Sequence, residues 1–171
     1  ASLDAGVVSY SPNGQFEMLA QGEQGADTFT YTGSYTHPTE GAVTDTGTVT
    51  IAVTGVNDAP VFTSDPAGLT PTDEDAVYTY NITATDVDNG AILTIAATTK
   101  PGWLTLTDNG DGTATLTGTP LNDDVGDNDV VLTVSDGIAA DVPQSFTVVV
   151  ANTNDDPTVA NPIADQPNVT E

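Results

Sequence analysis

The chain has 171 residues, with 25 Asp and Glu against a single Lys or Arg, and its formal net charge is −24. This balance argues against nucleic acid and anionic lipid as partners, because both are bound through clustered Lys and Arg. The hydrophobic fraction of 37% is enough for an ordinary core, so we expect a folded chain. There is no cysteine, and the apolar runs are too short to span a bilayer, so we expect neither disulfides nor membrane insertion.

The N-terminal third of the chain contains four predicted strands. Alternation of apolar and hydroxyl-bearing residues is clearest in the last of them, where Val, Ile and Val alternate with Thr. The predicted strands lie near Val7–Tyr10, Phe16–Leu19, Thr28–Thr32 and Thr46–Thr54. Four strands are too few to close a two-sheet sandwich, so we expect this region to be an incomplete domain.

About seven further strands are predicted between Pro60 and Asn152, separated by Asn-Gly and Asp-Gly turn signals. Their apolar faces are Tyr78, Tyr80 and Ile82; Leu93 and Ile95; Leu104 and Leu106; Val130, Leu132 and Val134; and Phe146, Val148 and Val150. The stretch Asp108–Gly112 superficially resembles a calcium loop. It lacks the distal Glu of an EF-hand and lies between two short strands, so a hairpin turn is predicted there.

The fold class that follows is all-β, with antiparallel immunoglobulin-like β-sandwich domains in tandem. The motifs GVNDAP and NTNDDP each follow a predicted strand rich in Val and Thr. Their asparagines, Asn57 and Asn154, are 97 positions apart (154 − 57). That spacing is about the length of one small sandwich domain. We therefore expect the C-terminal part of a repeat in 1–56, a complete domain with its linkers in 57–156, and the start of a following repeat in 157–171, as in a piece of a longer array.

Two stretches carry a family resemblance. The sequences VSYSPNGQFEMLAQGEQGADTFTYT and TGTVTIAVTGVNDAP resemble the latter half of a bacterial cadherin-like repeat of the VCBS kind. The sequences NITATDVDNGAILTI, PGWLTLTDNGDGTATLTGTP and NDVVLTVSDG resemble the dystroglycan-type cadherin-like (CADG) domain. The resemblance implies cadherin-like β-sandwich domains in tandem, as a segment of a large bacterial surface adhesin or of an extracellular polysaccharide-acting protein. It also implies Ca²⁺ bound at the linkers between adjacent repeats.

Acidic residues at strand ends provide an independent argument for a calcium site at the first linker. Ca²⁺ takes roughly six to eight oxygen ligands, which carboxylates and amides from several loops can supply. Asp86 and Asp88 follow a strand as an Asp-x-Asp pair, and in an extended segment such side chains point the same way. By cadherin analogy Asp136 lies beside them. The expected ligands of this first junction are Glu23, Asn57, Asp58, Asp86, Asp88 and Asp136.

A second junction is expected at the second linker, with matching ligands Glu74, Asp123, Asp124, Asn154, Asp155 and Asp156. Its Asp-x-Asp pair would lie beyond Glu171, so this site should be incomplete and weaker. The first linker also departs from the cadherin pattern, which usually has an acidic residue at the place of Gly55 and an amide at that of Ala59. This departure argues against three ions at the first junction.

Several other interpretations remain open. With so many acids, some Asp-x-Asp pair is expected by chance, and surface carboxylates are usually solvated charges. Catalysis is not expected, because the single His37 has no Cys or Ser partner in its sequence context. The alternative to a spacer is a carbohydrate-binding module, for which Trp103 would have to be an exposed platform rather than a core residue. Self-association by strand swapping, in which Thr158–Glu171 of one molecule adds to the open edge of another, is a further alternative.

Overall fold

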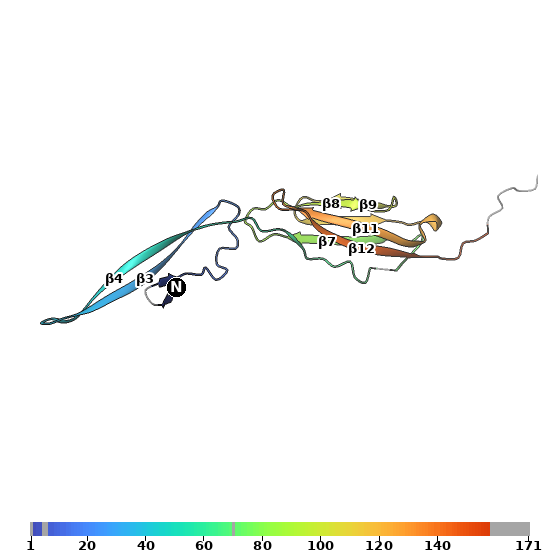
Figure 1. Ribbon diagram of the computed structural model, residues 1–171. Coiled ribbons are helices and arrows are strands. Elements are labelled where there is room, and N and C mark those ends of the chain that lie inside the picture. Colours follow the sequence, from blue (N-terminus) through green and yellow to red (C-terminus); the bar gives the residue numbers. More distant parts are fainter. Residues whose placement is uncertain (1, 5–6, 70, 158–171) are drawn as a thin grey trace, which may run out of the picture.

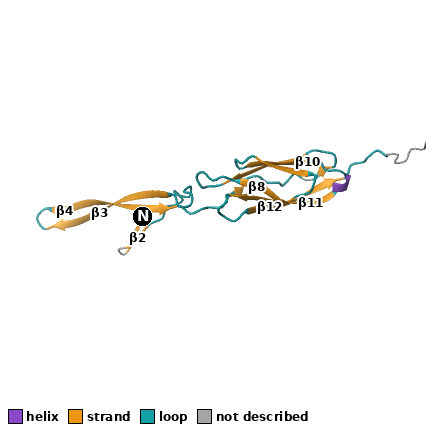
Figure 2. Cartoon of the chain, turned by 90° about the horizontal axis from the view of Figure 1, so that it is seen from above, coloured by secondary structure: helices purple, strands orange, loops and turns teal. Residues whose placement is uncertain are grey.

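A computed structural model of the chain describes residues 2–4, 7–69 and 71–157. The molecule is elongated, with a long twisted hairpin at one end and a two-layer β-sandwich at the other (Figure 1). A single short linker joins the two, as the view from above also shows (Figure 2). The all-β fold class is therefore confirmed. None of the helices in the described residues is long and apolar enough to cross a membrane.

The first unit consists of two antiparallel strand pairs. Strands β1 (Ser2–Asp4) and β2 (Val7–Ser9) form a small ribbon. Strands β3 (Gln24–His37) and β4 (Gly41–Thr54) form a hairpin in which each strand has 14 residues. Both strands of the hairpin are longer than the sequence pattern predicts.

The hairpin has two unlike faces because its side chains alternate. One face carries apolar and aromatic residues, such as the directly paired Phe29 and Val49, and the other carries mainly Thr hydroxyls. Within the described residues of the chain, β3 and β4 pair only with each other. On the apolar face, Tyr31 and Tyr35 remain 58% and 60% exposed.

The predicted strand at Phe16–Leu19 is wrong, since this stretch forms turns. The Leu19 N–H donates to the Phe16 carbonyl at 3.1 Å, which closes one turn. Both side chains pack onto the start of β3 at Gly25, where an added Cβ would lie 2.8 Å from the Phe16 ring. The apolar residues of this stretch therefore cover the end of the hairpin instead of extending a sheet.

The second unit is a sandwich of two four-stranded sheets, with strand orders β5-β7-β10-β9 and β6-β12-β11-β8. All of its strand pairs are antiparallel except β6 with β12, which is parallel. A short 3₁₀ turn, η1 (Asn122–Asp124), lies between β10 and β11. The strands are β5 (Val61–Phe62), β6 (Thr72–Asp73), β7 (Tyr78–Thr85), β8 (Thr94–Thr99), β9 (Leu104–Asp108), β10 (Thr113–Gly118), β11 (Gly126–Ser135) and β12 (Val142–Ala151).

The predicted apolar faces meet between the two sheets and form the core. Its buried residues include Tyr80, Ile82, Ile95, Leu104, Leu116, Val130, Leu132, Val134, Val148 and Val150. Trp103 packs against this core, edge-on to Tyr78, and its indole N–H donates to Asn128 Oδ1 at 3.1 Å. The hairpin turn predicted at Asp108–Gly112 is confirmed, because β9 and β10 pair antiparallel on either side of it.

Candidate metal centre

The first linker is tied to two loops at the near end of the sandwich. The Asn57 side-chain amide donates to Asp136 Oδ2 at 2.8 Å, and the backbone N–H of Asp58 donates to Asp88 Oδ2 at 3.0 Å. Asp136 follows β11, and Asp88 lies in the loop after β7. The folding of the sandwich thus brings Asp136 and Asp88 to the linker, although they lie 79 and 30 positions from their linker partners in the sequence.

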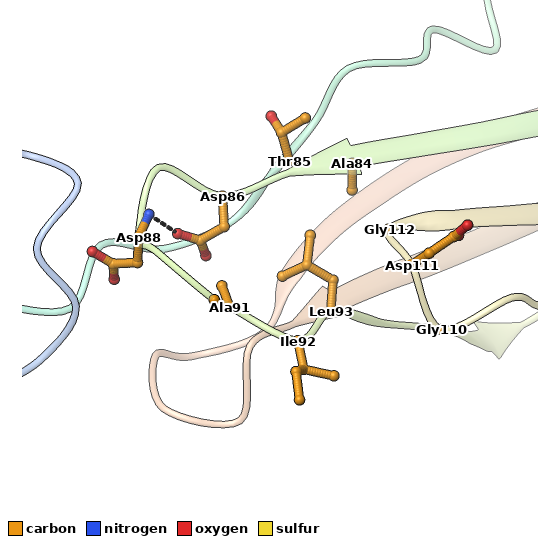
Figure 3. Close-up of a pocket in the computed structure, with 11 residues that line it drawn as sticks. Ala84, Thr85, Asp86, Asp88, Ala91, Ile92, Leu93, Gly110, Asp111 and Gly112 are labelled. Atoms are coloured by element: carbon orange, nitrogen blue, oxygen red, sulfur yellow. Dashed lines mark hydrogen bonds between the residues drawn. The ribbon is translucent and has the colours of Figure 1, made fainter.

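The Asp-x-Asp pair forms a compact carboxylate group beside this linker. Asp86 Oδ1 accepts the N–H of Asp88 at 2.8 Å, so the first acid fixes the backbone of the second (Figure 3). Asp88 is only 7% exposed. Among the described residues, no group donates a hydrogen bond to the buried atoms Asp86 Oδ2 and Asp88 Oδ1. Two buried carboxylate oxygens without partners are costly unless a cation or water satisfies them.

Asp136 lies on the other side of the linker, and the pKa of its carboxyl is lowered. The hydrogen bond from Asn57 lowers the pKa of the Asp136 carboxyl, and the backbone N–H groups of Ile138 and Ala139 add to this effect. Asn57, Asp88 and Asp136 line one hollow of about 260 Å³, together with Ala20 of the first unit. The hollow therefore has charged residues from two loops, an amide from the linker and a wall from the other unit.

The donor set at this end fits a hard divalent cation such as Ca²⁺. Carboxylate and amide oxygens are the ligands that Ca²⁺ prefers, and the two unpartnered oxygens of Asp86 and Asp88 are available to it. Among the described residues, however, no three Asp, Glu, His or Cys side chains lie close enough together to hold a metal ion by themselves. Backbone carbonyls, the amide and water would have to complete the shell.

Glu23 lies against the linker, but its carboxylate turns toward its own loop. Glu23 Oε2 accepts the N–H of Ala20 at 3.1 Å, and the Glu23 carbonyl accepts the N–H of Gly55 at 2.8 Å. The two units are joined by the hydrogen bond from the Asn89 N–H to the Met18 carbonyl at 2.9 Å. The first unit therefore touches the Asp88 loop through backbone groups, and among the described residues no hydrogen bond joins the Glu23 carboxylate to the other predicted ligands.

The far end of the sandwich carries the second predicted group. Glu74 is only 2% exposed, and its Oε1 accepts the backbone N–H of Thr153 at 2.5 Å. No described group donates to its other oxygen, Oε2, which is also buried. Glu74 thus presents a buried, unpartnered carboxylate oxygen at the second linker, as Asp86 and Asp88 do at the first.

The remaining predicted ligands of the second junction are more exposed. Asp155 accepts a hydrogen bond from the side chain of Asn122, and Asp124 caps the N–H of Leu121 at 2.9 Å. Asn154 donates to the carbonyl of its neighbour at 3.2 Å. Asp123 and Asp156 are exposed. The structure therefore brings Asp155 onto the η1 turn but gathers fewer acids here than at the first linker.

The loops before β3 and before β11 share one local geometry. In both, an acidic side chain accepts the N–H three residues earlier: Glu23 from Ala20 at 3.1 Å and Asp124 from Leu121 at 2.9 Å. In both, the backbone N–H of the acid donates to the carbonyl of that same residue, at 2.9 Å and 2.8 Å. The loop before β3 in the first unit therefore has the same hydrogen-bond pattern as the loop before β11 in the sandwich.

Comparison with known sequences identifies the second unit. The model of the cadherin-like domain family matches residues 56–151, which is more than half of the chain. The chain belongs to the cadherin-like domain family. The matched residues begin in the first linker and end with β12, so they contain the whole cadherin-like sandwich. No curated protein sequence matches the chain.

Solved structures with a similar fold include segments of much longer proteins. The endo-fucoidan hydrolase MfFcnA4 of glycoside hydrolase family 107 matches 84% of this chain at 20% identity with a TM-score of 0.51, and the chain covers 29% of it. A single-residue variant of that enzyme matches 81% at 23% identity with a TM-score of 0.49, and 20% of it is covered. The chain thus spans less than a third of each, and at 20% identity the likeness to MfFcnA4 concerns the fold alone.

Two contacts at the linkers were not predicted from the sequence. Asn122, whose side-chain amide donates to Asp155, lies next to the two predicted ligands Asp123 and Asp124. The contact between Asn89 and Met18 joins two backbone groups, so no side-chain pattern could have indicated it.

Proposed function

We propose that this chain is a calcium-stiffened spacer, made of tandem β-sandwich repeats, within a large bacterial cell-surface or secreted protein. The observation that carries the proposal is the meeting of linker and loop at the first junction, where Asn57 and Asp58 bind Asp136 and Asp88. A cation held there would be attached to the linker and to the sandwich at once. Membership of the cadherin-like domain family supports the same assignment.

The residues proposed to hold Ca²⁺ at the first junction are Asn57, Asp58, Asp86, Asp88 and Asp136, with Glu23 available from the first unit. The ion would neutralise the repulsion between these carboxylates and fix the linker. Asp86 orients Asp88 through its backbone, and Asn57 orients Asp136. At the second junction Glu74, Asp123, Asp124, Asn154, Asp155 and Asp156 are proposed as a weaker, partial set.

We propose the following repeat organisation. Residues 1–56 are the C-terminal part of a VCBS-type repeat, 57–156 a complete domain of the dystroglycan type, and 157–171 the start of another repeat. This division is supported by the matching loop geometry at Glu23 and Asp124. It is also supported by the linker motif, which recurs after 97 positions. Adjacent repeats are then the principal partners of each unit, and the location is outside the cell.

Isothermal titration with calcium tests the spacer proposal. The 171-residue chain should bind Ca²⁺ with measurable heat, and the double variant Asp86→Asn/Asp88→Asn should lose the stronger binding event. Asp127→Asn/Asp141→Asn is a matched control, because it removes the same charge from exposed positions on the sandwich. If the control variant loses binding as fully as the site variant, the ion is held by the general acidity of the surface and the proposal is wrong.

Carbohydrate binding is a second candidate, favoured by two observations. A structural neighbour is an endo-fucoidan hydrolase, and the exposed Tyr31 and Tyr35 lie on the same face of β3. Exposed aromatic rings are the usual platform for sugars. Glycan array binding that is lost in Tyr31→Ser/Tyr35→Ser would favour this function, whereas Trp103, packed on the core, should not respond to any glycan.

A further inference from the structure

The loop between β7 and β8 contains an Asn-Gly pair, Asn89 and Gly90, whose reactive groups have no hydrogen-bond partners. Both residues are exposed and lie at the centre of a turn, where Gly90 has a φ of +74°. The turn is loosely closed, because the Ala91 N–H meets the Asp88 carbonyl only at 3.4 Å. Within the described parts of the chain, neither the Gly90 N–H nor the Asn89 side-chain amide makes a hydrogen bond. These two groups are therefore free to react with each other.

The sandwich contains a second Asn-Gly pair, Asn109 and Gly110, in the turn between β9 and β10. Both pairs follow an aspartate, in the tripeptide Asp-Asn-Gly, so the local sequence does not distinguish them. In this turn the Gly110 N–H donates to Asp108 Oδ1 at 3.1 Å, and the Asn109 side-chain amide donates to Thr113 Oγ1 at 2.8 Å. The two groups that are free in the first pair are thus both engaged in the second.

The space around Gly90 also permits the backbone rotation that such a reaction needs. A Cβ added at Gly90 would meet no atom within 4 Å, so no neighbouring group obstructs the approach of its nitrogen to the side chain before it. Glycine itself has no Cβ and moves readily between backbone conformations. Asparagine is in addition one of the thermolabile residues of proteins. The first pair therefore combines a reactive side chain with an unhindered nitrogen.

We propose that Asn89 is a site of spontaneous deamidation in the folded chain. The Gly90 nitrogen attacks Asn89 Cγ and forms a C–N bond, while the bond between Cγ and Nδ2 breaks. The side-chain nitrogen leaves as ammonia, carrying the proton that the Gly90 nitrogen has lost. Water then opens the resulting succinimide ring at either of its carbonyl carbons, which gives aspartate or isoaspartate. In total one water is consumed and one ammonia is released, without oxidation or reduction.

The reaction places a new carboxylate where the two units meet. Asn89 lines the hollow of about 260 Å³ together with Asn57, Asp88 and Asp136. Its backbone N–H donates to the Met18 carbonyl of the first unit at 2.9 Å. Each event therefore adds one negative charge beside the carboxylates of the first junction. The consequence for calcium rests on the proposed function: the added oxygen joins the donor set and strengthens the binding of the ion.

Peptide mapping by mass spectrometry tests the assignment of the site. The folded chain is aged at mildly alkaline pH, and cleavage at aromatic residues then separates the two pairs, because Trp103 lies between them. Asn89 should deamidate about tenfold faster than Asn109, since two hydrogen bonds of ordinary strength must first break at Asn109. In urea, where the structure is lost, the two rates should become equal. Equal rates in the folded chain, or a ratio that urea leaves unchanged, would overturn the inference.

Calcium titration distinguishes this inference from the spacer proposal. Asn89→Asp reproduces the aspartate product, and Asn109→Asp is the matched control, because Asn109 is not among the residues that line the hollow. Asn89→Asp should bind calcium about fivefold more tightly than wild type, whereas Asn109→Asp should stay within about twofold of it. Equal affinities of the two variants would show that the new carboxylate does not reach the ion, and would overturn the predicted consequence. If neither variant nor wild type binds calcium, the spacer proposal fails, and the mass measurement alone decides whether Asn89 is the site.

Discussion

The backbone N–H of Asp58 donates to the Asp88 carboxylate at 3.0 Å, so the linker is fastened to the sandwich by a group that a cation could also use. Asp88 keeps its other oxygen, Oδ1, buried and without a described partner. The same carboxylate can therefore hold the linker through one oxygen and an ion through the other. This division of roles means that the ion would tighten an existing contact rather than create one.

Calcium should change the shape of the chain more than its fold. Like charges about 4 Å apart cost on the order of 1 kcal/mol even in water, so without a cation the carboxylates of the linker and of the sandwich loops repel one another and leave the junction free to flex. Small-angle scattering should give a longer and narrower distance distribution in calcium than in chelator, while circular dichroism stays nearly constant. Asp86→Asn/Asp88→Asn should remove the difference. A wild-type chain whose scattering is unaffected by calcium would show that the linker is an ordinary tether.

Replacing Glu74 by Gln should separate its metal role from its structural role. Gln keeps an acceptor for the Thr153 N–H but removes the buried charge whose Oε2 has no described partner. In chelator the variant should therefore be as stable as wild type, or more stable, because burying an unpaired carboxylate is costly. Wild type, by contrast, should gain about 2.7 kcal/mol at free calcium about 100 times the dissociation constant. Thermal unfolding in calcium and in chelator measures both effects, and sodium at equal ionic strength is the control.

The pKa of Asp136 should rise when Asn57 is replaced by Ala. The Asn57 amide is the largest cause of the lowered pKa, ahead of the backbone N–H of Ile138. A lowered pKa in the folded state stabilises the fold above the ordinary value of 3.8, and this contribution is lost as the pH falls through the folded value. Carboxyl carbon shifts followed by NMR in chelator measure the change directly. If the Asp136 value is the same in Asn57→Ala, the amide is not its main partner.

Gly55→Ala should loosen the junction between the two units. An added Cβ would overlap the backbone carbonyls of Leu19 and Ala20, which cannot move aside as a flexible side chain could. Hydrogen exchange of the Gly22 amide, which donates to the Gly55 carbonyl at 3.0 Å, should accelerate while the amides of β7 stay protected. Gly33→Ala in the hairpin is the matched control, because its Cβ would meet no atom closer than 4.0 Å.

Tyr78→Phe should leave the sandwich as stable as wild type, or slightly more stable. The Tyr78 hydroxyl is buried and has no hydrogen-bond partner among the described residues, so removing it relieves a desolvation cost of about 1–3 kcal/mol. Burial also raises the pKa of Tyr78 to about 12. Since the folded value lies above the ordinary 10.0, the stability that this tyrosine contributes is lost as the pH rises from about 10 to about 12. Unfolding in urea at neutral and alkaline pH should show that Tyr78→Phe is less sensitive to alkali.

The strands of the sandwich could be predicted because alternation there coincides with burial. Tyr78, Tyr80 and Ile82 alternate with polar residues and point into the core, and Val130, Leu132 and Val134 do the same. In the first unit, the alternation of apolar and polar residues did not predict the strands correctly. Apolar residues at Phe16–Leu19 cover the end of the hairpin from a turn, and period-two reasoning cannot distinguish that role from a strand.

The metal-ligand candidates could be chosen from sequence only as residue types at strand ends. That Asp86 and Asp88 share a loop follows from their spacing, and the structure adds that one fixes the other through a 2.8 Å hydrogen bond. The orientation of Glu23 could not be predicted, because its carboxylate satisfies the Ala20 N–H within its own loop. The absence of a side chain at Gly55 has a physical reason that the sequence alone does not show, namely the close approach of the Leu19 carbonyl.

The parallel pairing of β6 with β12 has a consequence for a chain under tension. The sandwich is entered at one pole and left at the other, and β6 lies beside the last strand with the same direction (Figure 1). A pull on the two ends therefore draws β6 and β12 past each other lengthwise, so that the hydrogen bonds between them, and the Glu74 contacts next to them, are loaded together. Two strands whose hydrogen bonds break one after another separate at a lower force. Rupture in a force spectrometer should accordingly occur as one abrupt event, governed by the unfolding rate of the sandwich.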